Sequence, residues 1–560
     1  MRSSQHYTIA ILGAGPGGIQ LAYYLQQSSV DYIVLEQSRS AASFYSQYPR
    51  RRDLISFNRV NTLFEDPRIK LRFDWNSLLT DDHSFPFSNF SRKLYPKADD
   101  LVRYLNSFAQ HFNLNISYSN NVQKISKLAD LSFKLVSDGS PNEVTCDKLV
   151  VASGFRKSYN PPIPGLELCE GYSDVSIDPE AFEGQRVFII GKGNSAFEIA
   201  DIALESCSLL HIASPNPIKL AWNSRHPGHV RANHTRLLDS YQLKLLNGTL
   251  DCHILSIKKN SNGEFVVLVS YVHADGETEE LVYDRVVNCA GFSFDSSVFD
   301  NSCTPTTLLN GKLPAITPFW ESVNVKGMFF AGTLMQARDF KKSSSAFIGG
   351  FRYNIRSLAK KLVSDISMFD FPCVEMRWTS SDVLANAILD RCNTTSGLWA
   401  QFKYLCDVIV IKKSTVNWYE EMPLQFVEEG GFGEAEEYFT LAFEWGEWSG
   451  DVMAIERHPT AEKAYTNVFL HPILRYYNRS RLVSVHHILE DLFGNYSADA
   501  ERGNVLSRGG LDIEMYHLRQ HFRPLAEFIL GTVSILEEQP DSQCNQPIGG
   551  ADACPLAWDG

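Results

Sequence analysis

Glycines at a fixed spacing form a first candidate binding site near the start of the chain. An apolar run at residues 8–12 leads into Gly13, Gly15 and Gly18, and residues 19–25 then have the apolar character of a helix. Gly13 permits a tight turn, Gly15 lets a pyrophosphate approach the backbone, and Gly18 lets the helix pack close to the strand. The N-terminus of that helix offers unpaired N–H groups to phosphate oxygens. The predicted phosphate cradle is Gly13, Gly15, Pro16, Gly17 and Gly18.

An acidic residue follows the next predicted strand. Residues 32–35 are apolar and end at Glu36, whose carboxylate can accept hydrogen bonds from both hydroxyls of an adenosine ribose. A glycine-rich loop alone also occurs in plain turns, but strand, glycines, helix, strand and acid stand here in the order of a dinucleotide-binding unit. The sequence therefore predicts a bound dinucleotide, with Glu36 and Gln37 at its ribose.

The same pattern returns in the middle of the chain. Residues 186–190 form an apolar strand that enters a G-x-G-x-x-A loop, and residues 197–204 continue as a helix. The following strand ends without an acid and two cations lie just beyond it, which favours the 2′-phosphate of NADPH over NADH. A solvated loop remains the alternative for residues 225–229. The residues predicted to bind this coenzyme are Gly191, Gly193, Asn194, Ser195, Ser214, Lys219 and Arg225.

Three further predicted strands end in small residues, where the backbone must come close to another group. Those ending near residues 154 and 291 resemble two crossing strands between which the second nucleotide domain is inserted into the first. The last strand ends at residues 332–333, and a helix running to residue 362 would direct its positive end at a flavin ring. The predicted cofactor contacts here are Ser153, Gly154, Gly332, Thr333 and Gly349.

The basic and aromatic segment 48–58 is the candidate for the reacting end of the cofactor. In flavoproteins with two dinucleotide sites, the chain crosses the flavin just after the first nucleotide unit, and sites favour loops on rigid scaffolds. We predict Arg50 at the polar edge of the flavin, and Asn58 or Asn61 beside the reacting oxygen, because an amide both donates and accepts hydrogen bonds. A solvated surface loop is the alternative.

Bulk properties restrict the class of protein. The chain has 560 residues, a net charge of −13 and no long basic run, so nucleic acid is not an expected partner. No apolar run is long enough to span a bilayer, and the first strand begins too early for a signal peptide to precede it. The 11 cysteines include no C-x-x-C pair, which indicates a reduced protein. We expect a cytoplasmic protein that binds no membrane and could form a homodimer.

The chain divides into an α/β part and a different C-terminal part. Residues 365–535 are rich in tryptophan, are predicted to be mainly helical and carry no nucleotide signature. The histidine pair at 486–487 lies outside any H-E-x-x-H pattern, so a helix face without metal is predicted there. The predicted segments are 1–160 and 286–364 for the FAD domain, 161–285 for the NADP domain inserted in it, 365–540 for a helix-rich domain, and 541–560 for a tail.

Several motifs carry a family resemblance, at residues 48–50, 54–56, 191–198, 239–244, 347–353, 469–472 and 486–491. With both glycine loops, residues 1–360 resemble the class B flavoprotein monooxygenase and pyridine-nucleotide reductase group. Most of the chain is similar to the FAD-dependent oxidoreductase domain-containing protein 2 family. Three positions depart from the larger group: Cys169 and Val175 replace the Phe and His of the Baeyer–Villiger fingerprint, and Thr333 replaces the Asp after the final strand.

The resemblance implies two Rossmann-like domains with FAD and NADPH as cofactors. The leading hypothesis is an NADPH-dependent monooxygenase, in which reduced FAD reacts with O₂ to give a flavin C4a-(hydro)peroxide that oxygenates a small organic substrate. A thiol or disulfide reductase is the alternative enzyme, but such enzymes pass electrons through paired thiols, for which no C-x-x-C is present. A redox sensor with a partner-binding C-terminal module is the third hypothesis.

Overall fold

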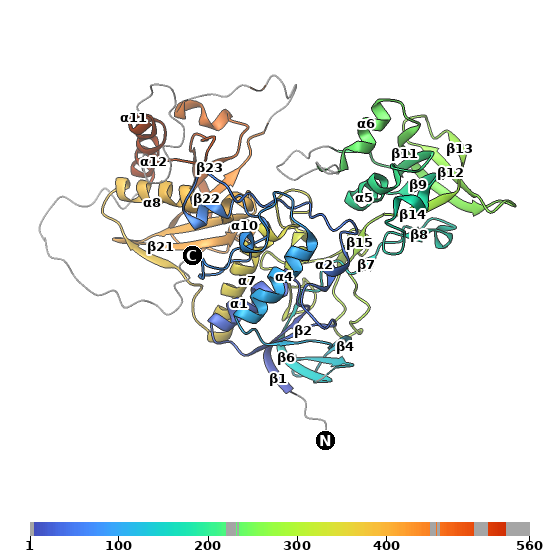
Figure 1. Cartoon of the computed structure of the whole chain (residues 1–560). Coiled ribbons are helices and arrows are strands. Elements are labelled where there is room, and N and C mark those ends of the chain that lie inside the picture. Colours follow the sequence, from blue (N-terminus) through green and yellow to red (C-terminus); the bar gives the residue numbers. More distant parts are fainter. Residues whose placement is uncertain are drawn as a thin grey trace, which may run out of the picture.

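Three large sheets organise the molecule. The computed structural model describes residues 5–139, 141–219, 231, 234–447, 455, 460–497 and 513–533. In the view of Figure 1 the first sheet lies at the bottom, the second at the upper right and the third at the upper left.

The first sheet follows the order β3-β2-β1-β6-β5-β4, with β18 also paired to β6. Its strands β2, β1, β6 and β18 are parallel, as expected of buried apolar strands joined by crossovers. Helices α1 and α7 pack against each other and α4 packs nearby. The bounds are β1 (Gln5–Leu12), α1 (Pro16–Gln27), β2 (Tyr32–Leu35), α4 (Ala98–His111), β3 (Ile116–Ser117), β4 (Val122–Lys127), β5 (Phe133–Ser137), β6 (Glu143–Val151), β18 (Met328–Phe330) and α7 (Ile348–Ser367).

The second sheet repeats this plan in the order β13-β12-β11-β10-β9-β14-β8. Strand β14 pairs in parallel with β9, so this sheet extends a few residues past the predicted boundary at 285. Its elements are β8 (Glu170–Gly171), β9 (Arg186–Ile190), α5 (Asn194–Ala203), β10 (Leu209–Ser214), α6 (Arg236–Gln242), β11 (Asn247–Lys259), β12 (Phe265–Tyr271), β13 (Thr278–Tyr283) and β14 (Arg285–Asn288).

Two crossing strands connect these sheets. The strands β7 (Lys157–Ser158) and β15 (Phe292–Ser293) pair with each other antiparallel, through Phe292 and Ser158. The chain leaves the first sheet after β6 and returns to it at β18, so the second domain is inserted in the first. The prediction of two Rossmann-like domains, one inside the other, is therefore confirmed.

The C-terminal part contains helices but is built on a six-stranded sheet with the order β19-β21-β20-β22-β23-β24. The prediction of a mainly helical domain needs this correction, and residues 486–487 end a strand where a helix was predicted. The bounds are β19 (Val374–Arg377), α8 (Ser381–Thr394), α9 (Gly397–Ala400), β20 (Leu405–Ile411), β21 (Thr415–Pro423), α10 (Leu424–Glu428), β22 (Glu437–Glu444), β23 (His471–Asn478), β24 (Arg481–His487), α11 (Ile513–His517) and α12 (Arg523–Thr532).

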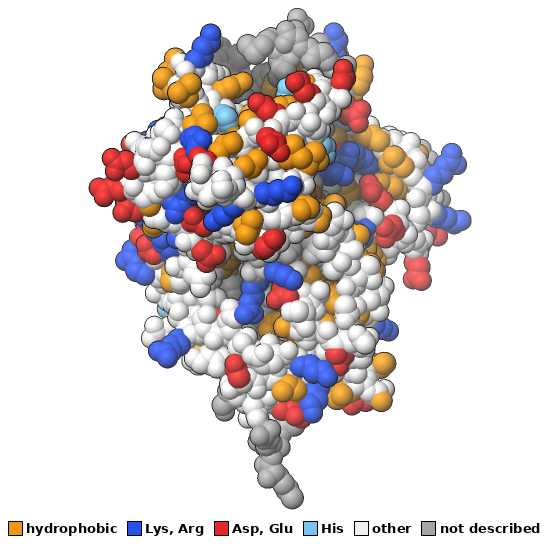
Figure 2. Space-filling view, turned by 90° about the vertical axis from the view of Figure 1, so that its right-hand side faces the viewer, with side chains coloured by type: hydrophobic (Ala, Val, Ile, Leu, Met, Phe, Trp, Pro, Cys, Tyr) orange, Lys and Arg blue, Asp and Glu red, His pale blue; other side chains and the backbone are white. Residues whose placement is uncertain are grey.

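Short elements complete the described chain. They are the helices α2 (Ser43–Gln47) and α3 (Pro67–Lys70), the paired strands β16 (Thr307–Leu308) and β17 (Leu313–Pro314), and the 3₁₀ helix Gly332–Ala337 that follows β18. None of the helices in the described ranges is long and apolar enough to cross a membrane. Acidic and basic side chains are interspersed over the described part of the face in Figure 2.

Buried charged side chains fasten the C-terminal sheet to the first domain. The Arg72 guanidinium donates to the carbonyl oxygens of Cys392, Asn393 and Thr395 at 2.7–3.3 Å. On α7, Arg356 forms a two-bond ion pair with Glu421, which is fully buried. Because breaking a buried charge pair is costly, these contacts fix the C-terminal sheet against α7.

Candidate cofactor and active site

The first glycine loop is shaped by close backbone packing at every glycine except one. Gly13 has a φ of +104°, and a Cβ on it would come within 3.0 Å of the Ala152 carbonyl oxygen. A Cβ on Gly17 would come within 2.7 Å of the Gly332 Cα. At Gly15, by contrast, a Cβ would meet no atom within 4 Å. The open space is therefore at Gly15, where a pyrophosphate is predicted to approach the backbone.

Glu36, predicted to bind the ribose, lines this groove. It is 3% exposed, and its Oε2 and Oε1 accept from the backbone N–H groups of Ala14 and Ser38 at 2.8 and 3.0 Å. The carboxylate thus braces the glycine loop while it lines the groove. The groove also includes the predicted residues Gly13, Gly15, Pro16, Gln37 and Ser153, while Gly154 lies beside the Thr333 hydroxyl.

The second glycine loop has the same architecture. Gly191 has a φ of +118° and lies against the Cys289 carbonyl, whereas a Cβ on Gly193 would meet nothing within 4 Å. The buried Oδ1 of Asn194 accepts no hydrogen bond from any described residue. An unpaired buried acceptor beside open backbone fits a ligand that brings its own donor. The predicted residues Gly193, Asn194 and Ser195 thus stand together at the start of α5.

A pocket of about 640 Å³ continues from this loop over the carboxyl ends of β14 and β8. In a doubly wound sheet the coenzyme lies across this edge, so the pocket suits its nicotinamide half. Its lining includes Gly171, Tyr172, Ser195, Asn288, Gly291 and Phe292. The sequence predicted only Ser195 among them as a contact, because the others follow strands whose place in the sheet was unknown.

The other end of the coenzyme site contains an acid that sequence reasoning missed. Strand β10 is parallel to β11, which places Asp251 next to Ser214. The buried Lys192 ammonium forms an ion pair with Asp251 and donates to the Ser214 and Asn216 carbonyl oxygens. The acid is therefore neutralised by a lysine of the glycine loop. Lys219 is exposed at the same edge, and Arg225 lies outside the described residues.

We expect NADPH to be preferred over NADH, and Lys219→Ala to reduce that preference about tenfold. A charge-assisted hydrogen bond to the 2′-phosphate contributes about 1.5–3 kcal/mol, and about 1.4 kcal/mol corresponds to a factor of ten. The measurement is kcat/KM for flavin reduction with each coenzyme. Equal or better values with NADH in the unmodified protein would contradict this assignment of the loop.

Segment 48–53 joins the two nucleotide domains. The Arg50 guanidinium donates to the carbonyl oxygens of Tyr172, Ser173 and Val175, the last at 2.9 Å. These bonds hold Arg50 on the inserted domain, and its place at the polar edge of the flavin stays a prediction. The neighbouring Arg51 forms an ion pair with Asp201 on α5.

Glu198 on α5 is the centre of this contact. Its carboxylate accepts from the Tyr172 hydroxyl and from the Arg51 backbone N–H, both at 2.5 Å. Burial raises the pKa of the Glu198 carboxyl, while these hydrogen bonds and the charges of Arg51 and Arg50 oppose that shift. We call Arg50, Arg51, Tyr172 and Glu198 the interdomain clamp.

Four aromatic rings fill the space between the two nucleotide sites. Phe44 lines the first groove, Tyr172 and Phe292 line the second pocket, and Tyr48 contacts all three. The Tyr48 ring lies 4.9 Å from Phe44, 5.2 Å from Phe292 and 5.5 Å from Tyr172, centroid to centroid. This aromatic junction therefore links the first groove to the second pocket.

The comparisons with known proteins agree with this geometry. Residues 10–332 match the family described as Pyridine nucleotide-disulphide oxidoreductase. The chain is also 33% identical over 557 residues to FAD-dependent oxidoreductase domain-containing protein 2 of Mus musculus, covering 90% of this chain and 83% of that protein. It belongs to this flavoprotein family. FAD and NADP(H), the cofactors predicted from the sequence, are the cofactors of these flavoproteins.

More distant matches cover a smaller part of the chain. Senecionine N-oxygenase of Tyria jacobaeae is 27% identical over 208 residues, 35% of this chain and 44% of that protein. The solved structure of an ornithine N-hydroxylase from Kutzneria sp. 744 superposes with a TM-score of 0.50 at 14% identity, covering 64% of this chain and 100% of that one. The latter likeness shows a shared fold.

A flavoprotein with this groove should be yellow when purified. We expect tightly but non-covalently bound FAD, because the open space at Gly15 and the acid at Glu36 match a phosphate and a ribose. The measurement is the visible spectrum, followed by acid or heat treatment that releases free FAD. A colourless protein that ignores added FAD would exclude this assignment.

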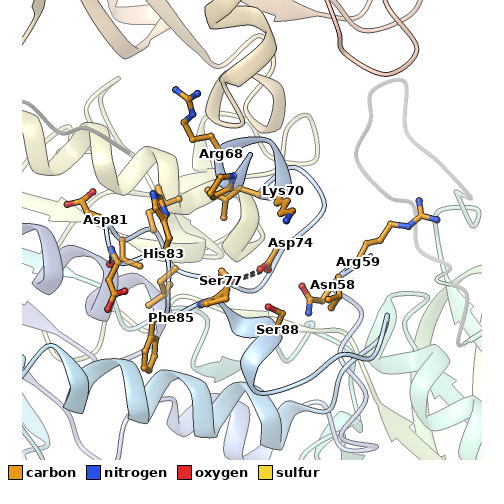
Figure 3. A pocket seen from close by; sticks show the side chains of 18 of the residues that line it. Asn58, Arg59, Arg68, Lys70, Asp74, Ser77, Asp81, His83, Phe85 and Ser88 are labelled. Carbon is orange, nitrogen blue, oxygen red and sulfur yellow. Dashed lines mark hydrogen bonds between the residues drawn. The ribbon is translucent and has the colours of Figure 1, made fainter. Parts of the chain in front are cut away.

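The two asparagines predicted beside the reacting oxygen are in different surroundings. Asn58 is 2% exposed, donates to the Ser91 carbonyl oxygen at 3.1 Å and lines a cavity shown in Figure 3. Asn61 is exposed and is absent from the lining of that cavity. The structure therefore brings Asn58, but not Asn61, into enclosed surroundings.

The start of α7 packs on an aromatic cluster adjacent to Asn58. A Cβ on Gly349 would come within 3.1 Å of the Trp75 Cα, and the Trp75 ring lies 4.2 Å from Phe57 and 5.4 Å from Phe347. A side chain here would push Trp75 back by a few tenths of an ångström. Whether the positive end of α7 faces the flavin, as the sequence suggests, remains a prediction.

The loop before α7 contains a buried carboxyl that is tied to the C-terminal domain. Asp339 is 4% exposed and accepts from the Ser343 hydroxyl, and burial raises the pKa of this carboxyl to about 7. Gln401 accepts from the Ser343 hydroxyl and from the Ser344 N–H, each at 3.2 Å. The C-terminal domain thus supports the loop that leads to α7.

Asp339→Asn is expected to change how stability depends on pH. Because the folded pKa lies above the unfolded value of 3.8, the folded protein loses stability as pH rises from about 4 to about 7. The variant lacks this loss, so its stability relative to the unmodified protein should increase over that range by roughly 3–4 kcal/mol. Urea unfolding at pH 4.5, 6.0 and 7.5 measures the free energy of unfolding of both proteins. A difference between the two proteins that does not change with pH would contradict the raised pKa of Asp339.

Proposed function

We propose that this flavoprotein is an NADPH-dependent FAD monooxygenase acting on a small organic substrate at a nitrogen, sulfur or carbon atom. NADPH, a proton, O₂ and the substrate give NADP⁺, water and the oxygenated product. One atom of O₂ ends in the water and the other in the product. FAD, when bound, would supply the hydride acceptor and the group that reacts with O₂. The protein supplies the glycine loops that hold both nucleotides and the interdomain clamp that orients them.

The observation that carries the proposal is the chemistry of the aromatic junction. Aromatic rings stand between the two nucleotide sites. Two thiols lie nearby: Cys169 in the lining of the second pocket and the buried Cys289 behind the Gly191 loop. Burial raises the pKa of both thiols, that of Cys169 to about 12. A thiol kept protonated is a poor nucleophile for disulfide exchange. None of the nine cysteines within the described ranges is in a disulfide.

A distant relative supports the same choice. Senecionine N-oxygenase, which is 27% identical over 208 residues, is named for oxygenation at nitrogen. An amine is accordingly the first substrate class to examine for this protein.

The test measures NADPH consumption, O₂ uptake, H₂O₂ release and product together, with amines, thioethers and aromatic compounds as candidates. A substrate should lower H₂O₂ release and give one product molecule for each NADPH. Disulfide reduction that continues without O₂ would replace this proposal with the reductase. Flavin reduction that never leads to oxygenated product with any candidate would favour the redox sensor.

A further inference from the structure

A cavity of about 320 Å³ lies among the extended segment 58–88, α1 and α7 (Figure 3). Its volume lies within the range of about 300–1,000 Å³ that is usual for small-molecule sites. No residue of either glycine loop lines it. The cavity is therefore distinct from the nucleotide grooves, and Asn58 is the residue that it shares with the segment proposed for the oxygen chemistry.

The floor of the cavity is apolar and held in place. Leu78 and Leu79 are buried there, next to Tyr24 and Phe85. The backbone of Leu79 exchanges two hydrogen bonds with the Gln20 side chain, and the Leu78 N–H donates to the Tyr104 hydroxyl at 2.8 Å. With its polar groups satisfied by the protein, this floor is preformed for an apolar body.

Charged side chains of both signs line the cavity. Arg68 and Lys70 extend from α3, with Glu65 and Asp74 also in the lining, and Figure 3 shows Lys70 on the side of Asp74 and Asp81 away from both. Serine and histidine hydrogen bonds lower the pKa of the Asp82 carboxyl, so it stays charged. One side therefore offers cations that have carboxylate neighbours, and the other offers the carboxylates of Asp81 and Asp82.

The two cations from α3 can each take a ligand carboxylate, in different ways. Arg68 binds Asp66 through Nε and Nη2, which leaves Nη1 without an acceptor among the described residues. Asp66 also caps α3 and is 19% exposed, so a ligand would add at Nη1 instead of replacing it. Lys70 pairs at 3.0 Å with Glu65, whose side chain is 94% exposed, and exchanging the carboxylate of such an exposed pair costs little.

We propose that this cavity binds a small molecule with a carboxylate and an ammonium group at opposite ends of an apolar body. The carboxylate binds Arg68 and Lys70, and the ammonium group binds at Asp81 and Asp82. The apolar body covers Leu78, Leu79 and Phe85. A molecule with only one charged end leaves the opposite wall unmatched and binds more weakly.

Calorimetry on the full-length protein with FAD bound tests this with ω-amino acids of increasing length. We expect 6-aminohexanoate or 8-aminooctanoate to bind at least about tenfold more tightly than hexanoate, octanoate, hexylamine or octylamine. Arg68→Gln and Asp82→Asn should each weaken binding about tenfold, the loss of one charge-assisted contact. Ser88→Trp should abolish it by filling the cavity from its rim.

Arg103→Gln is the matched control, because Arg103 pairs with Asp100 on the surface as Arg68 pairs with Asp66, yet it lies outside the cavity. It should leave binding unchanged. Equal affinity for the singly charged compounds, unchanged binding in Arg68→Gln, or no binding of any chain length would overturn the proposal. Because the experiment measures only binding affinity, a negative result would count against this ligand and not against the proposed monooxygenase activity.

Discussion

Glu198→Ala is expected to slow flavin reduction by bound NADPH by at least about 100-fold while the protein keeps its FAD. The Tyr172 hydroxyl and the Arg51 N–H would both lose their acceptor in the interdomain clamp. Each hydrogen bond to a charged group contributes about 1.5–3 kcal/mol, and two of them correspond to two or more factors of ten. Rapid-mixing measurement of flavin bleaching under anaerobic conditions gives the rate at saturating NADPH.

The effect should fall on the rate rather than on affinity, because Glu198 touches the clamp while the glycine loop binds the phosphates. Glu205→Ala is the control: Glu205 pairs with Arg236 near the same helix, but on the surface. Its rate should stay within about twofold, as for other exposed pairs. Should Glu198→Ala instead raise only the Kd for NADPH, the clamp would have no part in orienting the domains.

Local patterns were sufficient to predict the two nucleotide domains. A glycine loop is defined by neighbours in the chain: the strand before it, the turn, and the helix after it. Gly13, Gly191 and the crossing strands could be assigned for this reason. Even the insertion of one domain in the other followed, because two small-residue strand ends flank the second loop.

The C-terminal sheet could not be predicted by the same means. All eight residues of β22 and six of the seven in β20 are buried, so these strands show none of the alternation that marks a half-exposed strand. A mostly apolar and aromatic run of this kind, with a few buried polar residues such as Asp407 and Thr440, fits a buried helix equally well. The strand pairing that decides between them depends on residues far apart in the sequence.

Contacts between distant residues also explain the differences within the site. The acid next to Ser214 is Asp251 on the adjacent strand, and nothing in the sequence shows which strand lies beside β10. Likewise, Arg50 was predicted near the flavin from its position alone. Its partners Ser173 and Val175 follow more than a hundred residues later, in the inserted domain.

Asn58→Ala is expected to leave flavin reduction by NADPH intact but to lower product formed per NADPH about tenfold, with H₂O₂ rising to match. Asn58 is enclosed, and it pairs across a backbone bridge with Asp74, next to the Trp75 that packs on the start of α7. Losing one hydrogen bond of about 1.4 kcal/mol at the oxygen chemistry gives this factor. Product, H₂O₂ and NADPH are counted in the same reaction.

Asn61→Ala is the control for this prediction, because it removes the same type of side chain at an exposed position. In this variant NADPH oxidation should stay coupled to product formation. Replacing all 11 cysteines with Ser or Ala, if the fold survives, should also leave coupling largely intact, since no thiol is proposed to carry electrons. The three variants separate the two enzymes. If turnover stops in the variant that lacks cysteines, while Asn58→Ala still couples NADPH oxidation to product, a thiol relay carries the electrons. The disulfide reductase is then the correct assignment.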